Sequence, residues 1–157
     1  MALCGFGVVE EGEEGDARLI DYGAIATSAD LPLPERLRQV HARLVELISR
    51  HRPEAVAVEE LFFARNARTA LSVGHARGVA LLAAAQAGLP VYEYTPRQVK
   101  QAIAGYGSAP KEQVQEMVRL VLGLDFVPQP DDAADAVAVA ICHLHSARLN
   151  AIIAHTP

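Results

Sequence analysis

The sequence predicts a single α/β domain, in which two strands come first and helices then alternate with strands. Its length of 157 residues fits one domain, because domains contain roughly 100–200 residues. Apolar residues alternate with other residues at positions 6–9 and 19–25, which is the period of a half-buried strand. Helical spacings and short apolar runs then follow in turn. This order is typical of a sheet with helices on its faces.

The first half of the chain is expected to contain a hairpin, a helix and a third strand. Glycines and acidic residues separate the two alternating segments, which favours a hairpin. Between Pro34 and Pro53 the apolar residues recur at helical spacing, which predicts an amphipathic helix of about five turns. The apolar run from Glu54 to Val58 then predicts a buried strand.

The second half is expected to contain a core helix, a strand and three further helices. Gly88 and Pro90 end the core helix. Thr95 and Pro96 supply an N-cap and a first-turn proline for the helix after the strand. The expected ranges are 64–87 for the core helix, 91–94 for the strand, and 96–103, 110–122 and 132–149 for the remaining helices.

The composition excludes several classes of protein. Apolar residues make up 51% and charged residues 21% of the chain, as in average globular proteins. No apolar run approaches the ~18 residues of a membrane span, and residues 1–9 lack the pattern of a signal peptide. We therefore expect a soluble cytoplasmic protein with no membrane partner. Cys4 and Cys142 are too few for a disulfide framework and lack zinc-type spacing.

The charge distribution leaves room for a nucleic-acid partner despite a net charge of -5. Five acidic residues and no basic ones lie within residues 1–17, so the acidic excess is local. From Phe62 to Arg119 the chain has seven basic residues against three acidic ones. This stretch could therefore face phosphates.

Two groups of carboxylates are candidates for a functional site. Glu59 and Glu60 follow a predicted strand, and ligands of α/β sheets gather beyond the carboxyl ends of strands. Asp132 and Asp135 share one face of the last predicted helix, where like charges repel unless a cation such as Mg²⁺ lies between them. Each group also has a purely structural interpretation. Glu59 and Glu60 could mark the exposed end of a strand, and the acids at 131–135 could cap the last helix. Capping explains Asp131 well.

Basic and aromatic residues near these acids could contact a phosphate chain. Lys111 lies in the first turn of its predicted helix, where the dipole repels a cation unless a phosphate is bound. Lys100 precedes a glycine-containing loop that would let backbone approach a sugar-phosphate chain. Phe62 and Phe63 could stack on bases. Alternatively, the lysines are ordinary surface residues and the phenylalanines belong to the core. His143 is expected to pack or to form a hydrogen bond.

Five segments of the sequence resemble those of the RuvC-type Holliday-junction resolvases. They are AVEELFFARN at 57–66, GHARG at 74–78, YTPRQVK at 94–100, KEQV at 111–114 and DAADA at 132–136. The resemblance covers residues 5–145 of a single domain, 1–157, and leaves 146–157 as a tail. It implies a ribonuclease-H-like mixed sheet flanked by helices. It also implies a homodimer that nicks four-way junction DNA symmetrically with Mg²⁺, or Mn²⁺ in its place, in recombination and repair. A branch-migration motor complex would be its partner.

The same resemblance implies a role for each candidate residue. Glu59, Asp132 and Asp135 would hold the metal, and Lys111 would join them in catalysis beside the scissile phosphate. Metal-dependent phosphodiester hydrolysis needs such a combination of carboxylates and cations. The expected DNA contacts are Phe62, Phe63, Arg65, Arg68, Arg77, Arg97, Lys100 and Lys111.

The family's first strand, which is the centre of its sheet, has no counterpart in this sequence. Nor does the catalytic aspartate at the end of that strand. Residues 1–7 resemble the start of the family's second strand, so two strand edges are expected to face the place of the absent one. We expect the codons upstream of Met1 to encode it. The alternative function is therefore a catalytically impaired protein that binds junctions without cutting them. An unrelated nucleotide-binding domain would need a phosphate loop after a strand, and the sequence has none.

Overall fold

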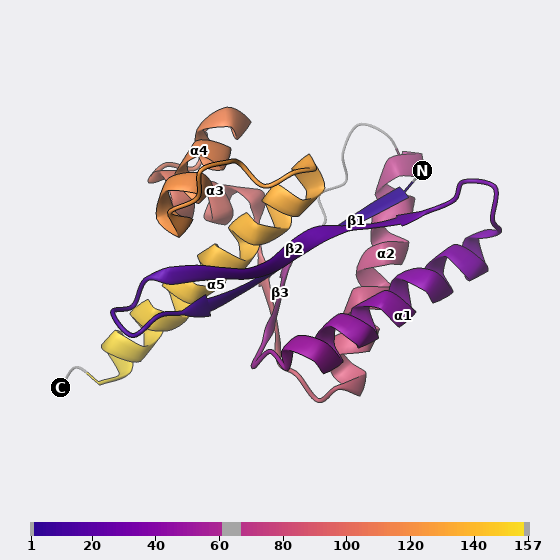
Figure 1. Cartoon of the computed structure of the whole chain (residues 1–157), viewed down its shortest axis with the longest axis horizontal. Helices are drawn as coiled ribbons and strands as arrows, with labels where there is room; N and C mark the ends of the chain where they lie inside the picture. Colours follow the sequence, from indigo (N-terminus) through magenta and orange to yellow (C-terminus); the bar gives the residue numbers. More distant parts are fainter. Residues whose placement is uncertain (1, 61–66, 156–157) are drawn as a thin grey trace.

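The computed structural model describes residues 2–60 and 67–155, which form four strands and five helices. Figure 1 shows these elements in chain order. They are β1 (Ala2–Glu11), β2 (Ala17–Thr27), α1 (Leu33–His51), β3 (Val56–Glu59), α2 (Ala67–Gln86), β4 (Val91–Tyr94), α3 (Pro96–Ala104), α4 (Lys111–Leu122) and α5 (Asp131–Ala154).

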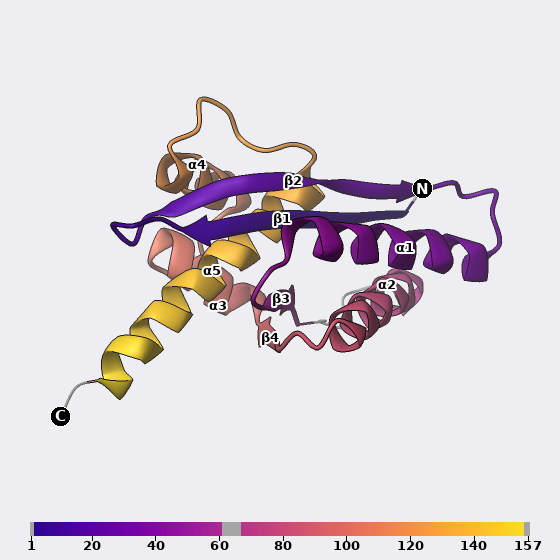
Figure 2. The same cartoon turned by 60° about the horizontal axis from the view of Figure 1, so that its bottom comes forward.

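The strands form two separate two-stranded sheets. β1 and β2 pair antiparallel as the predicted hairpin, with Cys4 opposite Ile25, and β3 pairs parallel with β4. Figure 2 shows the hairpin above and the β3–β4 pair below it, with α5 passing both. Among the described residues, β1 and β3 therefore each have one strand neighbour. This agrees with the expectation that these two strands are not joined to each other.

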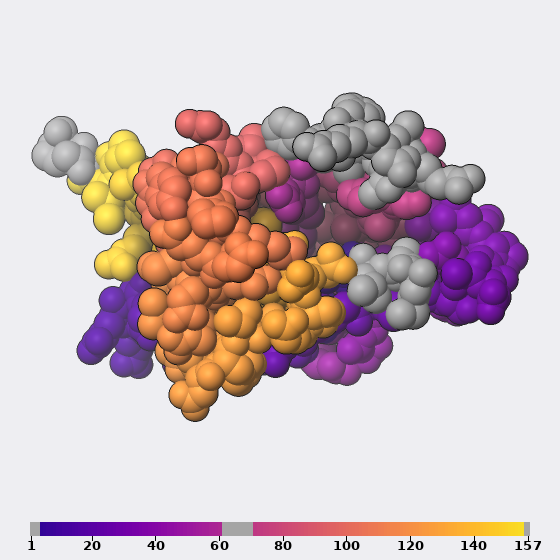
Figure 3. Space-filling view, turned by 90° about the horizontal axis from the view of Figure 1, so that it is seen from above, coloured from indigo at the N-terminus to yellow at the C-terminus, as the bar shows by residue number. Residues whose placement is uncertain are grey.

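Helix α5 is the centre of the fold, because it packs against all four strands and against α3 and α4. Its Val137 and Ile141 side chains are fully buried in the main core, together with Val118 of α4. A smaller core joins Ile25 of β2 to Val40 of α1. In the space-filling view from above, α4, the loop after it and the start of α5 form one continuous surface (Figure 3).

Two glycines let β1 lie directly against the first turns of α5. A Cβ atom at Gly5 would overlap the backbone carbonyl of Asp132, and one at Gly7 would come within 2.7 Å of the Val137 side chain. Such approaches are far closer than van der Waals contact allows. The hairpin is therefore held against the turn of α5 that carries the acidic residues.

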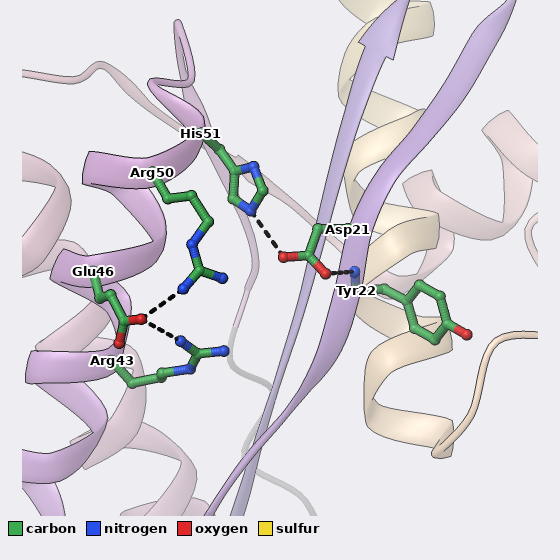
Figure 4. A network of polar contacts seen from close by, with 6 residues as sticks. All are labelled: Asp21, Tyr22, Arg43, Glu46, Arg50 and His51. Atoms are coloured by element: carbon green, nitrogen blue, oxygen red, sulfur yellow. Dashed lines mark hydrogen bonds and ion pairs between the residues drawn. The ribbon is translucent and has the colours of Figure 1, made fainter.

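Ion pairs and hydrogen bonds tie α1 to the hairpin at the end of that helix. The His51 ring nitrogen Nε2 lies 2.8 Å from the Asp21 carboxylate of β2, and Asp21 also accepts a hydrogen bond from the Tyr22 backbone N–H (Figure 4). On the exposed side of the helix, Glu46 pairs with both Arg43 and Arg50. The contact between His51 and Asp21 positions α1 on β2.

Most of the predicted helices are confirmed, with one clear error in length. α3 begins at the predicted N-cap, where Thr95 and Gln98 form a capping box. α5 was expected to end near Leu149, but it continues to Ala154, because residues 131–156 contain neither glycine nor proline. The first residues of the predicted core helix, 64–66, lie outside the described part of the chain, where the helix covers Ala67–Gln86.

Among the described helices, α5 alone is long and apolar enough to cross a membrane. The absence of a long uninterrupted apolar run had predicted no such segment, but the length and mean hydropathy of α5 meet the requirement. Its first half is the buried core described above, and core helices of water-soluble proteins have the same composition. Its last turns extend beyond the body of the molecule and expose Leu149 and Ile153 (Figure 2).

Candidate active site

The candidate site lies where β3 ends and α5 begins. Glu59 is the last residue of β3, and the backbone N–H of Glu60 still donates to the Tyr94 carbonyl of β4. This extra bond holds the strand end in place. Asp132 and Asp135 lie on the first turn and a half of α5, which packs against β3. Separate elements therefore bring the predicted acids toward one another.

The acidic groups at this site are poorly compensated. Burial of its carboxyl group raises the pKa of Glu59, Asp135 raises it further, and Lys100 opposes both effects. Burial likewise raises the pKa of Asp135, although Lys111 lowers it. Both side chains still reach solvent. Their raised pKa values mean that neighbouring groups disfavour the ionised forms, and a bound cation would favour them.

The carboxylates fit a cation that takes only part of its coordination shell from the protein. Among the residues that the structure describes, no group of three His, Cys, Asp or Glu side chains is close enough to hold a metal ion. Asp135 raises the pKa of Glu59, so these two carboxylates lie within electrostatic range of each other. Mg²⁺ is commonly bound through one or two carboxylates and completes its octahedron with water and substrate phosphate.

Lys111 is held at the edge of this acidic group by a residue that sequence reasoning assigned differently. Its Nζ lies 3.1 Å from an oxygen of Asp131. The prediction that Asp131 caps α5 is wrong, because Pro130 is the N-cap residue and no side chain caps this helix. The Asp131 carboxylate turns toward α4 instead, where it also accepts a hydrogen bond from Gln115. The partners are 16 and 20 residues apart in the sequence, so no local pattern could reveal them.

The remaining predicted DNA contacts lie in different environments. Lys100 of α3 is half-buried near Glu59, and the exposed Arg97 packs its side chain over Gly107. Arg77 forms an ion pair with Glu93 that links α2 to β4, so its guanidinium is already engaged. Phe62, Phe63 and Arg65 lie outside the described residues, as does the side chain of Arg68.

The prediction that His143 packs or forms a hydrogen bond is confirmed. Its Nδ1 lies 2.7 Å from the Tyr94 hydroxyl, and its ring centre is 4.4 Å from that of Tyr92. Burial lowers the pKa of this histidine. These contacts join α5 to β4.

Acids at a strand end and a helix start, with lysines from two neighbouring helices, define a class of site suited to a phosphodiester. The comparisons with known proteins give the same class. A family model described as crossover junction endodeoxyribonuclease RuvC matches residues 1–143. The protein of that name from Chloroflexus aggregans is 62% identical over 146 residues, which are 93% of this chain and 88% of the relative. Its counterpart from Alkaliphilus metalliredigens is 53% identical over 152 residues, 97% of this chain and 92% of the relative.

Solved structures agree. The chain superimposes on a Thermus thermophilus RuvC structure with a TM-score of 0.87 and 49% identity, covering 93% of this chain and 89% of that one. A T. thermophilus RuvC in complex with Holliday junction substrate gives a TM-score of 0.84 and 47% identity, with 92% and 88% covered. The chain therefore belongs to the crossover junction endodeoxyribonuclease RuvC family. The ribonuclease-H-like fold class predicted from the sequence is confirmed.

Proposed function

We propose that this chain is a structure-selective endodeoxyribonuclease that resolves Holliday junctions by symmetric, Mg²⁺-dependent nicking of DNA in recombination and repair. Its family membership and its likeness to a RuvC bound to junction substrate support this function. The observation that carries the proposal is the set of undercompensated carboxylates, Glu59 and Asp135, between two lysines. Such a set is costly in an empty site and useful when a cation and a phosphate are bound.

The proposed division of roles follows from the positions of the side chains. Glu59 and Asp135 would hold the cation, with Asp132 nearby in the first turn of α5. The cation, when bound, supplies Lewis-acid polarisation of the phosphate and activation of water. Lys111 lies at the exposed edge of the acids, where its charge would stabilise the negative charge that develops on the phosphate. Mn²⁺ is an expected substitute, because it accepts the same oxygen ligands.

DNA would approach over α3 and α4, which carry three of the predicted DNA contacts. Arg97, Lys100 and Lys111 all lie on these helices or at their starts. Phosphate contacts by such residues give salt-dependent affinity and fix the register of the DNA. Phe62, Phe63, Arg65 and Arg68 complete the proposed DNA-binding set by resemblance. Arg77 belongs to it only if its ion pair with Glu93 opens.

A junction-binding protein without nuclease activity is the second candidate. One observation favours it: no three acidic or other ligating side chains gather at one point among residues 2–60 and 67–155. Two-metal hydrolysis needs more carboxylate ligands than a pair provides. In this case the protein would bind four-way junctions and leave their strands intact.

We further propose that the chain acts as a homodimer through the exposed face of α2. Leu71 and Leu82 are 64% and 51% exposed, and Gly74 and Gly78 lie between them on the same stripe with open space where a Cβ would be. Small residues flanked by leucines let a second helix approach closely and bury apolar area. Symmetric nicking of two strands requires two sites, which a second copy of this chain supplies.

The cellular setting completes the proposal. Because its substrate is chromosomal DNA, we place the protein in the cytoplasm. A branch-migration motor complex, which moves junctions along DNA, is its proposed partner.

The deciding experiment is cleavage of a synthetic four-way junction labelled on each arm in turn. With Mg²⁺ or Mn²⁺, paired nicks at symmetric positions support the endonuclease, and EDTA should abolish them. Linear duplex of the same sequence is the control for structure selectivity. Retarded junction in a gel shift without any nicking would support the binding protein instead, and failure to bind a junction would contradict both.

A further inference from the structure

The N-termini of α4 and α5 meet through one carboxylate. Asp131, the first residue of α5, has one oxygen 3.1 Å from Lys111 Nζ and accepts a hydrogen bond on the other from Gln115 Nε2, also at 3.1 Å. Lys111 and Gln115 are one turn apart on α4, so they present neighbouring side chains. Both oxygens of Asp131 are thus taken by the same face of α4.

This arrangement has little to do with stability. The ion pair is exposed, with Lys111 and Asp131 side chains 50% and 59% accessible, and exposed pairs contribute little to folding. Asp131 also does not cap its own helix. What the contact does is geometric, because it limits the positions that a long, flexible lysine side chain can take.

The limit matters because other acids compete for the same lysine. The Lys111 ammonium is within electrostatic range of Asp132 and Asp135, which are proposed here to lie at the cation. Without Asp131, the ammonium would be drawn toward those carboxylates and would compete with a divalent cation for them. A lysine and a cation can serve one phosphate only if they occupy separate positions.

We infer that Asp131 is a positioning residue. It holds the Lys111 ammonium next to the cation-binding carboxylates and keeps it from pairing with them. The inference rests on the proposed function, since it assumes a cation at Glu59 and Asp135. It gives a function to Asp131, which directly precedes the predicted pair Asp132 and Asp135 and does not belong to it.

The test compares Asp131→Asn with the control Glu112→Gln. The control removes one negative charge from the residue that follows Lys111 in the sequence. The Glu112 side chain is exposed and forms no hydrogen bond or ion pair with the described part of the chain. The first readout is Mn²⁺ binding to the DNA-free protein, followed by electron paramagnetic resonance. We expect Asp131→Asn to weaken Mn²⁺ binding by about two- to five-fold, the effect of one lost surface ion pair, and Glu112→Gln to leave it unchanged. Asp131→Glu, which keeps the charge, should restore part of the affinity.

The second readout is the metal requirement of junction cleavage. Asp131→Asn should need a several-fold higher Mg²⁺ concentration and cleave more slowly. It should bind the junction in EDTA at least as tightly as the parent, because a negative charge near the phosphates is gone. Unchanged Mn²⁺ affinity in Asp131→Asn, or no measurable Mn²⁺ binding by the parent, would overturn the inference. A parent that binds Mn²⁺ but never cleaves would contradict the proposed nuclease, while the Mn²⁺ comparison would still decide the role of Asp131.

Discussion

Replacing Glu59 with glutamine should stabilise the protein at neutral pH while abolishing cleavage. The ionised Glu59 side chain is disfavoured by burial and by Asp135, and only Lys100 offsets these effects. Glutamine has the same shape but carries no charge. It therefore removes the cost of burying a charge and the repulsion from Asp135, and it loses the attraction to Lys100. Because Glu59 is exposed to solvent, water screens much of the difference, and we expect a gain of about 0.5–1 kcal/mol. For a chain of this size that raises Tm by roughly 1–4 °C.

The pH dependence gives the sign of this effect independently. A carboxyl group whose pKa is raised in the folded state binds its proton more tightly there than in the unfolded chain. The contribution of Glu59 to stability therefore falls as pH rises from about 4, the ordinary range of glutamate, through its raised pKa. The advantage of Glu59→Gln should be absent near pH 4 and complete at pH 7. Thermal unfolding at a series of pH values, followed by circular dichroism without metal, measures it.

A control variant, Glu60→Gln, and a measurement with added Mg²⁺ complete the experiment. Glu60→Gln changes the next residue along, which follows β3 and is exposed, and should leave Tm unchanged. Saturating Mg²⁺ should raise the Tm of the parent, because a ligand that binds only the folded state stabilises it, and should raise that of Glu59→Gln less. Junction binding in EDTA should stay within a few-fold. Equal stability of Glu59→Gln and parent at pH 7 would refute the reasoning, as would normal cleavage by the variant.

Three further experiments, two of them with a control variant, test other parts of the structure. Lys111→Ala should slow junction cleavage far more than it weakens metal-free binding in a gel shift, because a cation helps most where charge develops; equal losses would make Lys111 an ordinary phosphate contact. Gly5→Ala should cost about 1–3 kcal/mol in denaturant unfolding, because its Cβ overlaps the Asp132 carbonyl, whereas Gly74→Ala, in open space on α2, should not destabilise the monomer. Leu82→Glu should shift the protein to monomer in sedimentation velocity, and Leu120→Glu, equally exposed at 54% on α4, should leave the dimer intact; dimers in both variants would exclude the α2 face.

Local signals explain which elements the sequence could predict. The bounds of the strand at 91–94 and the first residue of α3 agree with the prediction, because Thr95 and Pro96 mark the start of a helix directly after the strand. The hairpin was predicted, but β1 and β2 extend beyond the alternating segments. Backbone pairing continues where glycines and acids interrupt the alternation, and periodicity cannot register it.

The contents of the site were less predictable than its location. The spacing of Asp132 and Asp135 and the place of Glu59 at a strand end indicated where carboxylates gather. The role of Asp131 did not follow, because an acid in the first turn of a helix is consistent with capping whatever its side chain contacts. Its actual partners, Lys111 and Gln115, depend on how α4 packs on α5. That packing involves buried residues of both helices, such as Val118 of α4 and Val137 of α5.

The same packing explains why a costly group of acids can persist in this protein. α5 begins with exposed aspartates and passes within about three turns into fully buried residues such as Val137 and Ile141. Burial of such side chains contributes about 1.5–3 kcal/mol each, more than the repulsion among the screened carboxylates costs. Because β1 lies against the backbone of this helix at Gly5 and Gly7, the acidic turn cannot move away to relieve its charge. The core thus holds the carboxylates where burial and neighbouring acids disfavour their ionised forms, which is the preorganisation that the proposed metal-dependent hydrolysis would use.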